Sequence, residues 1–300
     1  MTPGMNLYLW TDRLQPSHRG LLEQLRTLGY GSLEVPVLHH EDEAAYRSAA
    51  AWFDELGLTR STAAALGPAV NPASPDASVR AAALESLTRM IGCTAALGAH
   101  RLVGPLHSAL GVFTGVPPTA DEWRWSIDTV RAAGERAAAA GIQLAIEPLN
   151  RFECYLLNDQ RRGADYVRAV GLPNVGLLYD TFHAHIEEKD PAAALQDVYG
   201  ELMHVHASEN DRSTPGQGQV RWHETLSVLK RGGWDGVLMV EAFGMSLSAL
   251  AAATRIWRPM FESPEQLARD AVLFLHKAWA AADEGRDRSV ASSDFLIRVR

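Results

Sequence analysis

Short apolar runs alternate along the chain with longer segments whose apolar residues recur every three or four positions. Runs of the first kind are typical of buried strands, and segments of the second kind are typical of helices that cover them. The sequence predicts eight strands, at 5–10, 31–35, 58–66, 100–106, 144–146, 175–179, 202–205 and 237–240. Helical patterns follow these strands, among them 41–56, 119–140 and 222–231.

Strictly alternating strands and helices predict a parallel sheet, and eight such units favour closure into a (β/α)8 TIM barrel. The length of 300 residues fits one barrel, which typically needs about 250. We expect a single domain over residues 1–284 and a polar, charged C-terminal tail over 285–300. Within the barrel, Ser74 and Pro75 predict the N-cap and first residue of a helix that runs to about Leu97.

Composition limits the classes of protein to which the chain can belong. Hydrophobic residues make up 47% and charged residues 21% of the chain, as in globular proteins that work in water. The formal net charge of −8 argues against a nucleic-acid or membrane partner. No apolar run approaches the length of about 18 residues that a membrane span needs. Cys93 and Cys154 are the only cysteines, so we expect a reducing, cytoplasmic location and no signal peptide.

Four of the predicted strands end in a residue that can bind a metal. The strands at 144–146, 175–179, 202–205 and 237–240 run into Glu147, Asp180, His206 and Glu241. These residues are 33, 26 and 35 positions apart, and each interval is about one strand–helix unit, for which roughly 30 residues are needed. In a parallel barrel the four side chains would therefore meet at the same mouth, where such barrels carry their chemistry.

Three carboxylates and one imidazole predict a divalent metal site. Imidazole ligation disfavours Mg²⁺, so Mn²⁺ is the preferred metal, with Co²⁺ or Mg²⁺ as alternatives. His204 shares a face with His206 one layer deeper, which favours a supporting or packed role over direct ligation. Glu34 closes the second strand at the same mouth, where it either orients a metal-binding side chain or forms a structural pair.

Three further residues are candidates for substrate contact. Glu153 lies in the loop after the fifth strand, and its alternative role is that of a helix-capping or surface acid. His183 lies three residues after Asp180, where its alternative is loop packing. Arg212 lies six residues after His206, where a solvated arginine is the usual alternative.

These residues also carry a family resemblance. The segments Glu147–Glu153 (EPLNRFE), Asp180–His183 (DTFH), His206–Arg212 (HASENDR) and 240–243 (VEAF) resemble the sugar epimerases of the xylose-isomerase-like barrel superfamily. The similarity is greatest to the D-tagatose 3-epimerase and D-psicose (allulose) 3-epimerase group, and it extends in order over roughly residues 5–283. Two features depart from that group: Ser208 stands where glycine is frequent, and the tail has no counterpart.

The resemblance implies a function for each candidate. Glu147, Asp180, His206 and Glu241 would hold Mn²⁺ or Co²⁺, and the two glutamates would also act as the catalytic acid and base. Glu153, His183 and Arg212 would contact oxygen atoms of a sugar substrate. Family members are commonly dimers or tetramers, so the resemblance also implies a homodimer or a homotetramer.

The chemistry agrees with this assignment. A metal on the carbonyl and hydroxyl oxygens of a ketose stabilises the enediolate that forms when the neighbouring carbon loses its proton. Two carboxylates on opposite faces of that intermediate can remove the proton on one side and return it on the other, which inverts C3. The segment 216–218 (GQG) lacks the lysine and the strand-to-helix context of a phosphate loop, so we expect an unphosphorylated ketose.

Several alternatives remain open on the sequence. Return of the proton to the adjacent carbon would make the protein an aldose–ketose isomerase, and related sites serve hydroxypyruvate isomerases and inosose dehydratases. An endonuclease-type metal hydrolase would need more metal ligands and a basic groove. A sugar-binding protein without turnover would not need both glutamates. The sequence does not reveal which ketose is preferred.

Overall fold

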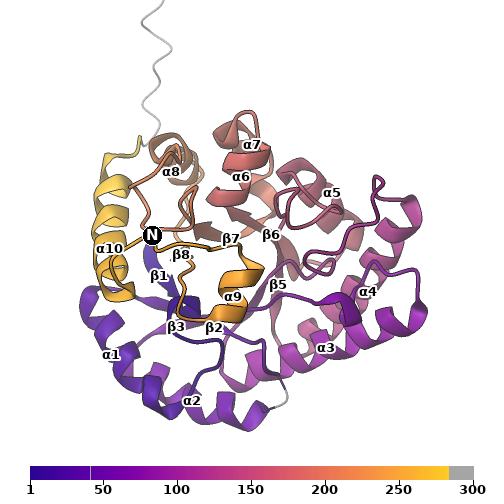
Figure 1. Cartoon of the computed structure of the whole chain (residues 1–300), viewed down its shortest axis with the longest axis horizontal. Helices are drawn as coiled ribbons and strands as arrows, with labels where there is room; N and C mark the ends of the chain where they lie inside the picture. The colour runs from indigo at the N-terminus through magenta and orange to yellow at the C-terminus, as the bar shows by residue number, and fades with distance from the viewer. Residues whose placement is uncertain (41, 284–300) are drawn as a thin grey trace, which may run out of the picture.

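Within residues 1–40 and 42–283, which this computed structural model describes, eight parallel strands close into a barrel (Figure 1). Each strand pairs with the next in sequence, and β8 pairs with β1. The strands are β1 (Thr2–Asn6), β2 (Ser32–Pro36), β3 (Thr59–Ala63), β4 (Arg101–Gly104), β5 (Gln143–Ile146), β6 (Val175–Asp180), β7 (Leu202–Ala207) and β8 (Val237–Val240). The predicted single-domain (β/α)8 barrel is confirmed. The tail at 285–300 lies outside the described residues, so the boundary at 284 stays a prediction.

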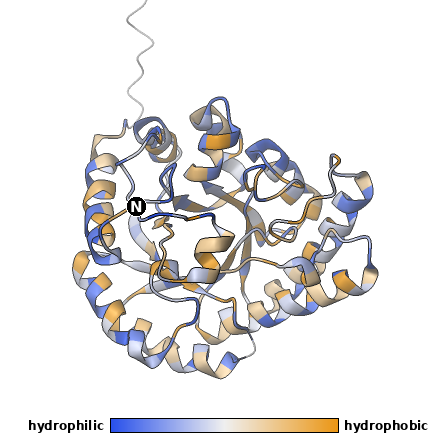
Figure 2. Ribbon diagram, viewed as in Figure 1, coloured by the Kyte–Doolittle hydropathy of each residue, from blue (hydrophilic) through white to orange (hydrophobic). Residues whose placement is uncertain are grey.

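Helices surround the barrel on its outer side, except for the short helix α9 in front of its opening (Figure 1). The helices are α1 (Arg19–Leu28), α2 (Glu43–Leu56), α3 (Ala77–Ala96), α4 (Ala120–Ala139), α5 (Gln160–Val170), α6 (Thr181–Glu187), α7 (Pro191–Asp197), α8 (Trp222–Arg231), α9 (Ser248–Ala253) and α10 (Pro264–Ala281). Figure 2 shows hydrophilic and hydrophobic residues interspersed along the outer helices, as expected where one face packs on the strands and the other meets water. Among the described residues, no helix has the length and apolar character needed to cross a bilayer.

Some element boundaries differ from the sequence prediction. β1 ends at Asn6, and Leu7–Leu9 form a 3₁₀ turn whose start is capped by the Asn6 side chain, which accepts from Tyr8 N at 2.8 Å. The third strand ends at Ala63 and not at residue 66. Helices α6 and α9 were not predicted, since elements of 7 and 6 residues show no clear helical period.

The N-cap of α3 was predicted at the wrong residue. Asp76 is the N-cap, and its carboxylate accepts from Ser78 N and from Ser78 Oγ, both at 2.7 Å. The Ser74 hydroxyl instead accepts from Asp76 N at 3.1 Å, which forms a turn ahead of the helix. A carboxylate also interacts favourably with the positive end of the helix dipole, so the acid takes the capping position two residues later than predicted.

The Asp76→Ala variant should therefore unfold more easily than the wild type. We expect the free energy of unfolding to fall by about 1 kcal/mol, the usual effect of losing an N-cap. Urea denaturation measures this change, and Ser74→Ala serves as the matched control. A larger loss in Ser74→Ala than in Asp76→Ala would contradict the assignment.

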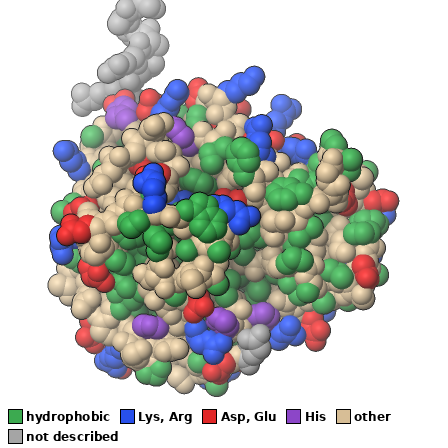
Figure 3. Space-filling model, in the orientation of Figure 1, with side chains coloured by type: hydrophobic (Ala, Val, Ile, Leu, Met, Phe, Trp, Pro, Cys, Tyr) green, Lys and Arg blue, Asp and Glu red, His purple; other side chains and the backbone are tan. Residues whose placement is uncertain are grey.

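The short helix α9 lies in front of the barrel opening (Figure 1). It belongs to the connection between β8 and α10, and Leu250, Ala253 and Thr254 line the pocket beneath it. Figure 3 shows hydrophobic side chains next to Lys and Arg side chains at the centre of this face. Residues of α9 thus line the same pocket as the candidate residues at the strand ends.

Candidate active site

The structure brings together the four residues predicted to bind a metal. Glu147 follows β5, Asp180 ends β6, His206 lies in β7 and Glu241 follows β8. One potential ligand atom from each lies within 4.8 Å of the others. The exposed fraction of each residue is 5% or less. This convergence arises because consecutive parallel strands end at the same side of the barrel.

The donor set fits a divalent cation. His206 Nδ1 lies 3.8 Å from Glu147 Oε1, 4.0 Å from Asp180 Oδ2 and 3.5 Å from Glu241 Oε1. Ligand atoms bound to one ion at about 2.0–2.2 Å lie at such separations from one another. His206 Nδ1 and Glu147 Oε1 are buried and have no hydrogen-bond partner. Buried polar atoms are rarely left unpaired, so these two atoms mark the position where a cation would be held.

Glu34 orients the imidazole of His206 from the opposite side. Glu34 Oε1 lies 2.8 Å from His206 Nε2, which leaves Nδ1 directed into the cluster. The same carboxylate accepts from Asn6 Nδ2 at 2.8 Å and from Ser61 Oγ at 2.7 Å. His204 Nε2 lies 3.0 Å from Glu34 Oε2, so His204 also contacts this carboxylate. Of the two roles left open by the sequence, the geometry supports the orienting role for Glu34.

The two glutamates differ in proton affinity because their neighbours differ. Burial raises the pKa of Glu147 well above its ordinary range, and the charge of Glu241 raises this pKa further. Burial also acts to raise the pKa of Glu241, but the charges of His206 and Arg212 outweigh it and hold this pKa below its ordinary value. The surroundings thus shift the pKa values of the two glutamates in opposite directions.

The other two cluster members also have shifted pKa values. Burial raises the pKa of Asp180 to about 6, against the lowering effect of Arg212. Burial lowers the pKa of His206, but the charges of Glu241 and Glu34 prevail and raise it well above its ordinary value. Strong shifts of this kind inside a cavity are typical of functional sites.

Arg212 enters the cluster and is not solvated. Its Nη1 donates to Asp180 Oδ2 at 2.9 Å and to Glu241 Oε2 at 2.6 Å. The guanidinium carbon lies 3.8 Å from the ring centroid of Phe182 and 4.9 Å from that of Phe243. Arg212 also has a positive φ of 63°, an uncommon conformation for a residue other than glycine. Its position is therefore set by specific contacts on several sides.

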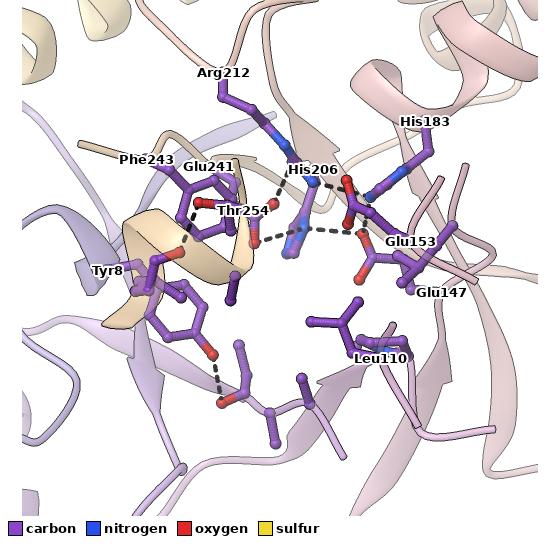
Figure 4. Close-up of a pocket in the computed structure, with 18 of the residues that line it drawn as sticks. Tyr8, Leu110, Glu147, Glu153, His183, His206, Arg212, Glu241, Phe243 and Thr254 are labelled. Atoms are coloured by element: carbon purple, nitrogen blue, oxygen red, sulfur yellow. Dashed lines mark hydrogen bonds and ion pairs between the residues drawn. The ribbon is translucent and has the colours of Figure 1, made fainter. Parts of the chain in front are cut away.

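His183 and Glu153 lie beside the same cluster (Figure 4). His183 is buried, its Nδ1 accepts from Asn150 N at 2.9 Å, and its Nε2 lies 3.6 Å from Glu147 Oε1. Burial and the charge of Arg212 lower the pKa of His183 well below its ordinary value, so the imidazole is neutral. Glu153 is half-buried, accepts from Asn150 Nδ2 at 2.8 Å and lines the pocket. All three residues predicted to contact substrate thus surround one cavity.

The close approach of β4 to the backbone that follows β3 requires glycine. Gly104 has a φ of 126°, and an added Cβ would overlap the carbonyl oxygen of Ala64. The carbonyl oxygen of Gly104 accepts from Glu147 N at 3.0 Å. Glycine at position 104 therefore permits the close contact with Ala64, and its carbonyl oxygen also holds the backbone of Glu147.

Most of the remaining pocket wall was not predicted from the sequence. It includes Tyr8, Leu38, Leu110, Phe243, Leu250 and Thr254. Tyr8 stacks on Phe243 with ring centroids 5.7 Å apart. These residues come from the loops after different strands and from α9, and no local pattern in the sequence connects them. The one signal in the sequence for some of these residues is that they follow a predicted strand closely.

Comparison with known proteins identifies a family whose sequence pattern this chain shares. Residues 22–278 match the xylose isomerase-like TIM barrel family. A ketose 3-epimerase of Arthrobacter globiformis is 31% identical over 280 residues, which cover 92% of this chain and 96% of that protein.

Solved structures agree with this result. The structure of an L-ribulose 3-epimerase superposes with a TM-score of 0.88 at 28% identity, over 93% of this chain and 94% of that one. A D-psicose 3-epimerase from Clostridium cellulolyticum, solved with D-tagatose, gives a TM-score of 0.85 at 26% identity, over 94% of this chain and 100% of that one.

Proposed function

The chain belongs to the xylose isomerase-like TIM barrel family, and on this premise we propose that it is a metal-dependent isomerase that inverts C3 of a free ketose. One observation carries the proposal. Glu147 and Glu241 lie on either side of His206, at the edge of one pocket (Figure 4). A planar intermediate held between them would present one face to each carboxyl group.

We propose that Glu147, Asp180, His206 and Glu241 hold a divalent cation, with Mn²⁺ as the preferred ion and Co²⁺ or Mg²⁺ as alternatives. The unpartnered atoms of Glu147 and His206 support this assignment. A bound divalent ion polarises the carbonyl and the neighbouring hydroxyl of a ketose and so makes the C3 proton more acidic.

Proton transfer is the task of the two glutamates. One of the two glutamates, as the carboxylate, would remove the C3 proton from one face, and the other, as the carboxylic acid, would supply a proton to the other face. The roles exchange when the reaction runs in the opposite direction. A positioned acid or base typically contributes 10²–10⁴-fold to the rate. Inversion follows because the two carboxyl groups face the intermediate from different sides.

Three neighbouring residues would hold the reacting end of the sugar. Arg212 offers donors to oxygen atoms that gain negative charge, and its contacts with Phe182 and Phe243 hold it in place. His183, as a neutral imidazole, can donate or accept without adding charge. Glu153 can accept from a substrate hydroxyl. These assignments rest on the position of the three side chains around the pocket.

The surroundings support an unphosphorylated substrate. The segment 216–218 was the one glycine-rich candidate for phosphate binding, and Gly216 N donates to Glu209 Oε2 at 2.7 Å. That amide is therefore engaged within the protein. Leu250 and Ala253 of α9 and the adjacent Thr254 also line the pocket.

The deciding experiment is incubation with D-fructose, D-tagatose, D-psicose and L-ribulose in D₂O, with and without Mn²⁺. We expect metal-dependent deuterium at C3 together with the C3 epimer, read by NMR. Deuterium at C1 with formation of an aldose would replace the proposal with an aldose–ketose isomerase. No exchange in any ketose would reject it and direct the search to hydroxypyruvate, inososes and sugar phosphates.

Replacing Glu34 tests whether its contact with His206 contributes to metal binding. In Glu34→Gln the amide is a weaker acceptor for His206 and adds a donor beside His204, so His206 is held less firmly. We expect the affinity for Mn²⁺ to fall about 10- to 100-fold, as measured by calorimetry. Ser61→Ala is the control, since it removes one donor to Glu34 and keeps the contact with His206. Unchanged Mn²⁺ affinity in Glu34→Gln would contradict the orienting role.

The predicted homodimer or homotetramer and the cytoplasmic location stay predictions. Sedimentation equilibrium of the purified protein measures the first, and localisation of a tagged chain measures the second. Neither enters the catalytic proposal, since every group named above comes from one chain.

A further inference from the structure

The loop between β7 and α8, residues 208–221, is built around one buried carboxylate. Glu209 has no exposed surface. Its Oε1 accepts from Asn210 N at 3.1 Å and from Val220 N at 2.9 Å. Its Oε2 accepts from Gly216 N at 2.7 Å and from the indole Nε1 of Trp222 at 2.9 Å. The Glu209 side chain therefore forms hydrogen bonds with both ends and the middle of a loop that contains no helix or strand.

The loop is also packed tightly against this carboxylate. A Cβ added to Gly218 would lie 2.6 Å from Glu209 Cγ and would overlap Asn210 Oδ1. The backbone thus wraps around the Glu209 side chain at van der Waals distance. Four charge-assisted hydrogen bonds and this packing fix the loop more firmly than its irregular backbone would by itself.

The same loop carries Arg212 into the active site. Arg212 N donates to the Glu209 carbonyl oxygen at 3.0 Å, which closes a turn directly between the two residues. Arg212 occupies the left-handed region with a φ of 63°, so its conformation must be imposed by its surroundings. On the other side, Phe243 N donates to the Arg212 carbonyl oxygen at 3.1 Å. The loop is therefore anchored at the end of β8 and around Glu209.

We propose that Glu209 is a positioning residue that holds Arg212 at Asp180 and Glu241. Glu209 does not line the pocket, so it acts through the loop and does not touch the sugar. The consequence for turnover rests on the proposed epimerase function, whereas the effect on the position of Arg212 does not.

The test is a double-mutant cycle with Glu209→Gln, Arg212→Ala and the double variant. We expect Glu209→Gln to lower kcat/KM for ketose epimerisation by roughly 10- to 100-fold, since a shift of about 1 Å in a substrate-positioning group has an effect of that size. In the Arg212→Ala background the same change should lower kcat/KM by less than about threefold, because its target is gone. Equal losses in both backgrounds, or full activity in Glu209→Gln, would overturn the proposal.

Two readouts separate this proposal from the proposed function. In Glu209→Gln, hydrogen exchange at the amides of Gly216 and Val220 should accelerate, and a crystal structure should show Arg212 displaced from Asp180 and Glu241. An unmoved Arg212 overturns the proposal whatever the enzyme catalyses. If the wild type turns over no ketose, the epimerase function is rejected. Hydrogen exchange and the position of Arg212 in Glu209→Gln then still test the role of Glu209.

Two further variants complete the design. Gly218→Ala disturbs the same packing without removing a charge, and it replaces Glu209→Gln if that variant does not fold. We expect Gly218→Ala to lower kcat/KM as well. Glu122→Gln is the matched control, since Glu122 is a buried carboxylate that accepts from Thr119 N at 2.7 Å and from Tyr155 Oη at 2.5 Å. It should reduce thermal stability and leave kcat/KM unchanged. A loss of kcat/KM in Glu122→Gln as large as in Glu209→Gln would assign the effect to general destabilisation.

Discussion

Replacing either glutamate should strongly reduce epimerisation and leave a diagnostic exchange reaction at C3. We expect Glu147→Gln and Glu241→Gln to lower kcat/KM for C3 inversion by about 10²–10⁴-fold, the usual contribution of a positioned acid or base. Each variant keeps one carboxylate on one face of the intermediate. Each should therefore still exchange the C3 proton of only one member of an epimer pair with D₂O, and the two variants should select opposite members.

NMR of D-fructose and D-psicose with each variant at saturating Mn²⁺ measures this selectivity. Calorimetry on the same samples shows whether metal is bound, since both residues belong to the cluster. Tyr8→Phe is the control for a change in the pocket wall away from the cluster, and it should keep exchange with both epimers. Exchange of both epimers by Glu147→Gln would show that a single base serves both faces, which would contradict the two-glutamate assignment.

Removal of divalent metal should have the second large effect. We expect a chelated, dialysed sample to lose C3 exchange completely and to recover it on addition of Mn²⁺. The same addition should raise the unfolding temperature, because an ion that binds only the folded protein stabilises it by about 2.7 kcal/mol at one hundred times its Kd. Mn²⁺ should stabilise the folded protein because the cluster contains three buried carboxyl groups that repel one another, and a bound cation reduces this repulsion.

Asp180→Asn provides the matching variant. It keeps the size of the side chain and removes one charged ligand that has no proposed role in proton transfer. We expect weaker Mn²⁺ binding and a smaller stabilisation by Mn²⁺ than in the wild type. Full exchange in the stripped protein, with no change in unfolding temperature on addition of Mn²⁺, would reject the metal-dependent mechanism.

Much of the architecture followed from local patterns. Strand positions are encoded by short apolar runs, and the barrel follows from their regular alternation with helices. The convergence of Glu147, Asp180, His206 and Glu241 was predictable for the same reason, because parallel strands end at one side of the barrel. The short helices α6 and α9 and the cap at Asp76 were missed, since each depends on one or two turns of chain and on single hydrogen bonds.

The sequence by itself determined which residues meet at the mouth, because strand order and the alternation of side chains fix that end of the barrel. Only the tertiary structure decided how they are held. Glu34 contacts His206 across 172 positions in the sequence, and Arg212 lies between Phe182 of α6 and Phe243 of the segment after β8. Such contacts depend on barrel closure and loop conformation. Both are set by packing between distant segments, for which a local pattern carries no signal.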